Sequence, residues 1–197
     1  MALWADTRGP CAIAISEHHA SEDGYLPAPL ILASAMAAVT REVSIMVAAT
    51  LLPLYDPVRL AEEMIVLDHI SKGRVGYVLG MGYRPSEYAL YGLEYGKRGE
   101  IADDKLGQLL DTLRQASAGT DMPRVTPAPF SPGQPMIMWG GGSKPAARRA
   151  GRKKFVVARL GDAALLGAAA LLATGYGTLD IATILEAARA GVAPDGV

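Results

Sequence analysis

Three observations in this chain of 197 residues predict an α/β fold with a parallel sheet of the barrel type. Short apolar runs alternate with stretches at helical spacing, as in strands joined by crossover helices. Several runs end in small residues, at 48–50, 80–82 and 140–142. The first run, residues 11–17, carries small side chains on one face and isoleucines on the other. Such a strand fits between a crowded barrel interior and a layer of helices.

Composition and charge limit the class of protein. Hydrophobic residues make up 50% of the chain, enough for one domain with a sizeable core. The net charge of −1 gives no general attraction to nucleic acid or anionic lipid. Cys11 is the single cysteine, which excludes an intramolecular disulfide and a cysteine-rich zinc site. The sequence shows neither a secretion signal nor an apolar run of about 18 residues, so we expect a cytoplasmic protein with no membrane partner.

The first half of the chain predicts two strands and two helices. Residues 11–17 form the first strand, and residues 30–39 form an alanine-rich apolar helix. Residues 43–49 are apolar and β-branched, so they predict a buried strand. Asp56 can cap the next helix, and Pro57 fits its first position. The apolar stripe of this helix is Leu60, Met64, Leu67 and Ile70.

The second half continues the alternation. Residues 75–79 predict a third strand, and the loop at 83–88 is expected to contain a short helix. Four tyrosines are expected to pack this loop against the barrel mouth: Tyr83, Tyr88, Tyr91 and Tyr95. A longer helix spans about residues 100–118. Its inward side chains are Leu106, Leu109, Leu110 and Leu113. Residues 136–139 form the fourth strand, which a glycine-rich turn joins to another helix.

The tail of the chain differs in composition from the rest. Residues 1–150 are expected to form a partial barrel, whereas alanine, glycine and arginine are prominent in residues 151–197. In one interpretation, helices near residues 162–173 and 179–190 continue the same domain. In the other, the tail is an out-of-frame translation of a GC-rich gene. Both interpretations stay open at the level of sequence.

Two adjacent histidines, His18 and His19, follow the first strand and suggest a metal site when taken alone. Successive side chains of a strand point to opposite faces, so the two rings do not both reach one ion. The alternation puts His18 on the small face, inside a barrel, and puts His19 on the other face with Glu17. His18 then lies at the carboxyl end of a strand, where α/β barrels place catalytic groups. The alternative is a structural histidine; with only His69 as a further histidine, we predict no metal site.

A glycine-rich strand end is a candidate phosphate site. Gly141, Gly142, Ser143 and Lys144 follow the fourth strand and precede a helix. Backbone N–H groups, a hydroxyl and a positive charge can therefore approach an anion together. The alternative interpretation is a glycine-rich tight turn.

Two neighbouring strands end in small residues, which can form a shelf for an aromatic ring system. The shelf residues are Ala48, Ala49, Thr50, Gly80, Met81 and Gly82. A pair of glycines is weak evidence for a cofactor, and close packing between strand and helix is the alternative.

Taken in order, six segments resemble the bacterial luciferase-like flavin-dependent monooxygenases. They are SEHH (16–19), EDGYLP (22–27), LLPLYDPVRLAEE (51–63), LDHISKGR (67–74), GYRPSEY (82–88) and WGGGS (139–143). Their combination and order are specific, and they cover about residues 12–150. The resemblance implies an incomplete TIM (β/α)8-type barrel with about strands 2 to 5 recognisable. The chain is then truncated, since such a barrel typically needs about 250 residues.

The resemblance also assigns roles to residues. His18 corresponds to the active-site histidine near the reactive edge of the flavin. Ala48 and Ala49 correspond to a bulge, often with a non-prolyl cis peptide, that supports the flavin ring. Residues 80–82 are implied to lie near the ring and residues 141–144 near the phosphate. Met81 stands where many relatives carry an arginine, so one polar contact to the cofactor is in question.

The implied function is that of an oxidoreductase. A luciferase-like monooxygenase uses reduced FMN and O2 to oxygenate a small organic substrate, and a separate flavin reductase or dehydrogenase supplies the reduced cofactor. The protein provides placement and proton control, with His18 as acid or base. A first alternative is hydride transfer with a deazaflavin, coenzyme F420. A second is a non-catalytic partial barrel that buries its open edges by self-association, and a homo-oligomer is expected.

Overall fold

The computed structural model describes residues 1–8, 12–118, 125–141 and 157–158. The structure divides into two units, Met1–Val157 and Ala158–Val197, and the description below concerns the first. The two interpretations of the tail, and the candidate residues Gly142, Ser143 and Lys144, therefore lie outside the described residues.

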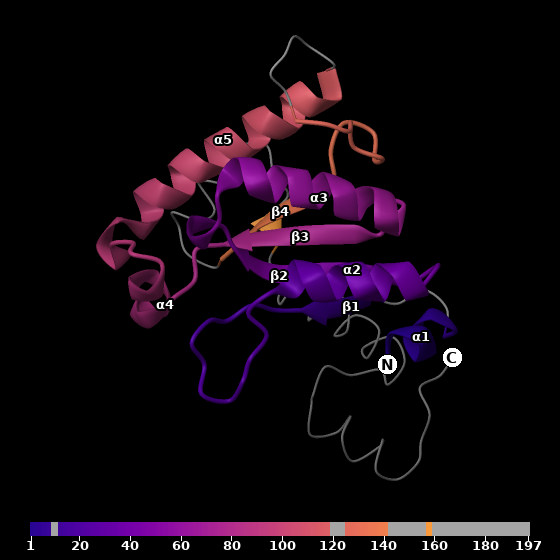
Figure 1. Ribbon diagram of the computed structural model, residues 1–197, viewed down its shortest axis with the longest axis horizontal. Helices are drawn as coiled ribbons and strands as arrows, with labels where there is room; N and C mark the ends of the chain where they lie inside the picture. The colour runs from indigo at the N-terminus through magenta and orange to yellow at the C-terminus, as the bar shows by residue number, and fades with distance from the viewer. Residues whose placement is uncertain (9–11, 119–124, 142–156, 159–197) are drawn as a thin grey trace, which may run out of the picture. The chain divides into compact units, whose positions relative to one another are not determined.

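A parallel sheet with helices on one face forms the framework. The strands β1 (Ala12–Ile15), β2 (Ser44–Leu51), β3 (Val75–Gly80) and β4 (Met136–Gly140) pair in parallel in chain order. The short strand β5 (Val157–Ala158) comes next in the sheet order. Helices α2 (Pro29–Val39), α3 (Pro57–Ser71) and α5 (Arg98–Ala118) cover the sheet, with α3 between the other two (Figure 1). The predicted α/β class with an incomplete barrel is confirmed.

Short elements connect this framework. Helix α1 (Ala2–Asp6) precedes β1, and the 3₁₀ helix η1 (Leu52–Leu54) leads from β2 to α3. Helix α4 (Pro85–Leu90) and the 3₁₀ helix η2 (Tyr95–Lys97) lie between β3 and α5. In the part of the chain that the structure describes, no helix is long and apolar enough to cross a membrane.

The two faces of the sheet differ as the alternation predicts. The face under the helices is buried and comprises Ile45, Val47, Val75, Tyr77, Leu79, Ile137 and Trp139. On the other face of β1, Ala12 and Ala14 are exposed, and on β4 Met136 is 53% exposed. This second face is the one that points inward in a closed barrel. In an unclosed barrel part of this face stays in contact with solvent, as it does in the described chain.

The strands differ from the expectation at their ends. β1 stops at Ile15, so residues 16–19 lie in a loop and not in the predicted strand over 11–17. β2 runs on to Leu51 through a bulge between Ala48 and Thr50, and the Ala48–Ala49 peptide is cis. Ladder pairing with β3 resumes after the bulge, which is why the strand is longer than its apolar run.

Helix α3 begins as the sequence predicts. The Asp56 side chain accepts a hydrogen bond from the Arg59 N–H, and Pro57 occupies the first turn. Leu60, Met64 and Leu67 are buried, but the prediction for Ile70 is wrong because its side chain is 42% exposed. At 100° per residue Ser71 continues the stripe, and Ser71 is buried instead.

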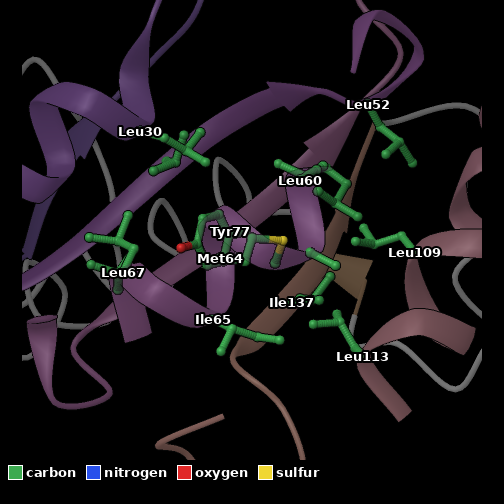
Figure 2. Packing of buried hydrophobic residues seen from close by; sticks show 14 of the residues in the cluster. Leu30, Leu52, Leu60, Met64, Ile65, Leu67, Tyr77, Leu109, Leu113 and Ile137 are labelled. Carbon is green, nitrogen blue, oxygen red and sulfur yellow. The ribbon is translucent and has the colours of Figure 1, made fainter. Parts of the chain in front are cut away.

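The core lies between the sheet, α3 and α5. Figure 2 shows Leu60, Leu109, Leu113 and Ile137 converging between these elements. The four inward leucines predicted for α5 are all buried: Leu106, Leu109, Leu110 and Leu113. Their spacing of three and four residues supplies one continuous apolar stripe, which fixes α5 against α3.

Replacing Leu109 with alanine should lower the free energy of unfolding by about 2–5 kcal/mol, because it leaves a cavity at a fully buried position. Leu90→Ala, at an exposed position of α4, is the control and should change it by less than about 0.5 kcal/mol. Urea unfolding followed by circular dichroism measures both, and equal losses would contradict the packing described here.

Candidate functional site

The candidate residues from three strands meet at one edge of the sheet. Ile15 pairs with Val47, and beyond them Leu51 pairs with Gly80, so β1, β2 and β3 end side by side. This edge carries His18 after β1, the shelf residues of β2 and β3, and Gly141 directly after β4. Carboxyl ends of parallel strands are where α/β folds bind ligands.

The two histidines bind two different glutamates. His18 Nδ1 lies 2.9 Å from Glu87 Oε1, and His19 Nε2 lies 2.7 Å from Glu17 Oε1. The predicted separation of the two rings is confirmed, although a loop and not a strand carries them. In the described ranges no three histidine, cysteine or acidic side chains are grouped so that they could hold a metal ion.

Glu87 is a candidate site residue that the sequence patterns did not single out. Its side chain is fully buried in the first turn of α4, and Oε1 also accepts the His19 backbone N–H at 3.0 Å. Within the described part of the chain, Oε2 has no hydrogen-bond partner. A signal was present: an acidic residue follows Arg84-Pro85 just after the carboxyl end of a strand.

Two tyrosine rings flank the His18 ring. Tyr25 and Tyr83 make edge-on contacts with centroid distances of 4.9 and 5.5 Å. The Tyr83 hydroxyl lies 3.3 Å from His18 Nε2, whereas the Tyr25 hydroxyl bonds Ser16 Oγ at 2.8 Å. Tyr83 therefore does more than pack the loop against the mouth, which was the expectation. It contacts the candidate active-site histidine and leaves 65% of its own side chain exposed.

Five of the six shelf residues have small side chains, and Met81 is the exception. Ala48 and Ala49 are half-buried, and the bulge and cis peptide expected there are present. A Cβ atom on Gly80 would lie 2.9 Å from Ala49 Cβ, so strand approach explains this glycine. Gly82 has a φ of 72°, a conformation that favours glycine.

Thr50 and Met81 complete this edge in different ways. Thr50 is buried, and its Oγ1 has no partner among the residues that the structure describes. Met81 is half-buried against the core, and its carbonyl accepts a hydrogen bond from the Tyr88 hydroxyl. Thr50 pairs with Leu79, which lies on the face under the helices, so its hydroxyl belongs to that face. The edge therefore presents backbone, small side chains and the half-buried Met81 to a ligand.

The second pair, His19 and Glu17, faces a different part of the molecule. Glu17 Oε2 accepts the Leu51 N–H at 3.0 Å, and His19 Nδ1 lies 3.1 Å from the Tyr91 hydroxyl. His19, Tyr55 and Tyr91 border an open hollow of about 510 Å³ that residues of α2 and α3 also line. This pair therefore ties the loop after β1 to the end of β2 and lies apart from the shelf.

Burial shifts the ionisation of Glu17 and of its neighbour Tyr55. It raises the pKa of Glu17 above its usual range, against the opposing hydrogen bonds from the Leu51 N–H and His19. It also raises the pKa of Tyr55, and the nearby Glu17 carboxylate adds to this effect. The folded chain therefore holds the Glu17 proton to a higher pH than the unfolded chain does.

The variant Glu17→Gln removes this titration while keeping a polar group of the same size. Because the folded-state pKa is raised, the native chain should lose stability relative to the variant as pH rises from 4.5 through the folded-state pKa. Below 4.5 the difference should be constant. Urea unfolding across a pH series measures it, with Glu22→Gln at an exposed position as control. A native chain that gains stability over the variant as pH rises would overturn the assignment.

Comparison with known proteins identifies the family of this chain. A family model described as luciferase-like monooxygenase matches residues 1–175. The alpha chain of alkanal monooxygenase from Photorhabdus luminescens is 27% identical over 124 residues, which are 59% of this chain and 34% of that protein. The chain spans about a quarter to a third of the length of this and two other curated relatives.

Solved structures show the same fold. Monooxygenase RslO1 from Streptomyces bottropensis matches with a TM-score of 0.66 at 24% identity. The match covers 74% of this chain and 47% of RslO1. The oxygenating constituent of 3,6-diketocamphane monooxygenase from Pseudomonas putida, in complex with FMN, has a TM-score of 0.66 at 23% identity, with 78% and 48% covered. Since the family model matches well over half of its residues, the chain belongs to the luciferase-like monooxygenase family.

Proposed function

We propose that this chain is a flavin-dependent monooxygenase that uses reduced FMN and O2 to oxygenate a small organic substrate, with a separate flavin reductase or dehydrogenase as supplier of reduced cofactor. Family membership supports the reaction class. One observation carries the assignment of the site: His18 is held by the buried Glu87 beside an edge of the sheet where β2 and β3 end mostly in small residues.

The residues at this edge fit a flat cofactor. One buried polar atom beside this edge, Glu87 Oε2, lacks a partner within the described residues, and buried polar groups are nearly always hydrogen-bonded. The shelf residues would hold the ring: Ala48, Ala49, Thr50, Gly80, Met81 and Gly82. The strand end after β4 would hold the phosphate: Gly141, Gly142, Ser143 and Lys144. When bound, the flavin supplies the electrons and the activation of O2.

The side chains of the protein would place the substrate and control a proton. Glu87 Oε1 accepts the His19 N–H, so its contact with His18 is best satisfied when Nδ1 carries the ring proton. Nε2 is then an acceptor at the mouth of the site, toward Tyr83. A histidine fixed in one orientation and one tautomer can act as a general acid or base near neutral pH.

His18→Ala should retain the flavin but lower turnover by about 10²–10⁴-fold, the usual contribution of a positioned acid or base. Flavin absorbance after reconstitution of the full chain with FMN measures binding, and FMN oxidation with product formation measures turnover. His69→Ala is the matched control, because His69 is exposed and bonds the Ala128 carbonyl away from this edge. Unchanged turnover in His18→Ala would remove His18 from the mechanism.

Lys144→Ala should weaken FMN binding by about tenfold or more, since a charge-assisted contact to phosphate contributes about 1.5–3 kcal/mol. Riboflavin, which lacks the phosphate, should bind both chains equally. Fluorescence titration with the two flavins measures this difference, with Lys154→Ala in the same basic run as control. An equal loss for both flavins would place Lys144 outside the phosphate site.

Two alternative functions have distinct signatures. A deazaflavin enzyme would bind coenzyme F420 in preference to FMN and would transfer hydride without consuming O2. A non-catalytic partial barrel would bind neither cofactor and would form a concentration-dependent oligomer. The exposed sheet face of Ala12, Ala14 and Met136 favours this last candidate, because such a face is buried in a closed barrel. Titration with both cofactors together with sedimentation velocity separates the three.

A further inference from the structure

A chain of hydrogen bonds runs from the buried edge of the sheet to the surface through Glu87, His18 and Tyr83. Glu87 Oε1 and His18 Nδ1 are 2.9 Å apart, and His18 Nε2 and the Tyr83 hydroxyl are 3.3 Å apart. The Glu87 side chain has no solvent exposure, whereas Tyr83 is 65% exposed. The three groups therefore span the distance between the interior and water.

The inner end of this chain is a carboxylate oxygen without a partner. Glu87 Oε2 is buried and unbonded within the described residues, and it lies 3.7 Å from the position of a Cβ built on Gly82. Burying a polar oxygen without a hydrogen bond is costly, so this atom is explained by a proton or donor that arrives during function. Gly82 follows the carboxyl end of β3, so Oε2 faces the edge where the cofactor is proposed to bind.

The hydrogen-bond pattern gives the chain a direction. A Glu87 carboxylate oxygen that accepts the His19 N–H can also accept from His18 Nδ1, and this role assigns the ring proton to Nδ1. With that tautomer, the lone pair of Nε2 accepts from the Tyr83 hydroxyl. A ring with its proton on the inner nitrogen and its lone pair on the outer one is arranged to pass a proton inward.

We propose that Tyr83, His18 and Glu87 form a proton path that delivers a proton from solvent to the carboxyl end of β3. The Tyr83 O–H bond breaks as Nε2–H forms, and Tyr83 takes a new proton from water. The Nδ1–H bond breaks as a proton joins the Glu87 carboxylate, so one proton moves from water to Glu87. His18 is left as the Nε2–H tautomer. Once the delivered proton has been consumed, a turn of the ring away from Glu87 lets Nδ1 take a proton from water while Nε2–H gives one to water, which restores the starting tautomer with no net gain of protons. The path rests on the proposed function, because an oxygenating site would consume the delivered proton.

The geometry of the path can be tested on the ligand-free full chain. Long-range proton–nitrogen NMR of the imidazole rings should show His18 in the Nδ1–H tautomer. Tyr83→Phe should slow exchange of the His18 ring proton with water by about tenfold or more, as expected when one hydrogen-bonded transfer step is removed. Tyr91→Phe removes the equivalent hydroxyl from His19 and should leave His18 unchanged. An Nε2–H tautomer, or exchange that Tyr83→Phe does not slow, would overturn the path.

Turnover provides the second readout. In the FMN-loaded chain, Tyr83→Phe and Glu87→Gln should lower kcat by about 10²-fold with little change in KM and increase the solvent deuterium isotope effect on kcat. Tyr91→Phe should change neither quantity. Because Tyr83 is exposed, Tyr83→Phe should fold, and it tests the path even if Glu87→Gln does not fold. A chain that binds no flavin disproves the proposed function, whereas the NMR result then decides the path by itself.

Discussion

The buried carboxylate of Glu87 is the contact on which the arrangement of the carboxyl edge depends. One oxygen holds both the His18 ring and the His19 backbone N–H, so it joins the loop after β1 to helix α4, which follows β3. β2 lies between these two strands in the sheet. Loss of this carboxylate would free the ring and leave a buried N–H group without a partner, at a cost of about 1–3 kcal/mol.

A second buried glutamate performs the matching task on the neighbouring strand. Glu17 bonds His19 and the Leu51 N–H, so it fixes the same loop to the end of β2 directly after the bulge. Burying two carboxylates is unfavourable unless each is hydrogen-bonded. Both Glu17 oxygens are hydrogen-bonded, whereas Glu87 Oε2 has no partner among the residues that the structure describes. This difference is why we assign Glu17 a supporting role and propose Glu87 for the chemistry of the site.

The layer of helices stabilises the sheet, and with it the carboxyl edge, although the barrel is incomplete. Helices α2, α3 and α5 bury one face of the sheet, and the leucines of α5 close the core beneath β3 and β4 (Figures 1 and 2). The strand ends depend on this face and on neighbouring strands; β2 and β3 are paired on both sides, and β1 is paired with β2. The opposite face carries the small side chains of a barrel interior and is partly exposed. The helices and strands that hold the carboxyl edge of β2 and β3 are therefore present, although the chain is shorter than its relatives.

The sequence by itself determined the elements, because their signals are short-range. Alternation and periodicity predicted the strands and helices, Asp56-Pro57 predicted the start of α3, and strand geometry separated His18 from His19. Resemblance to the family located the bulge at Ala48-Ala49. Tertiary structure alone decided that Ser71 and not Ile70 continues the stripe, and that Glu87 and Tyr83 meet His18. Glu87 lies 69 residues from His18 in the chain. Which carboxylate reaches the His18 ring depends on how α4 packs against the loop after β1, and no local sequence pattern encodes that packing.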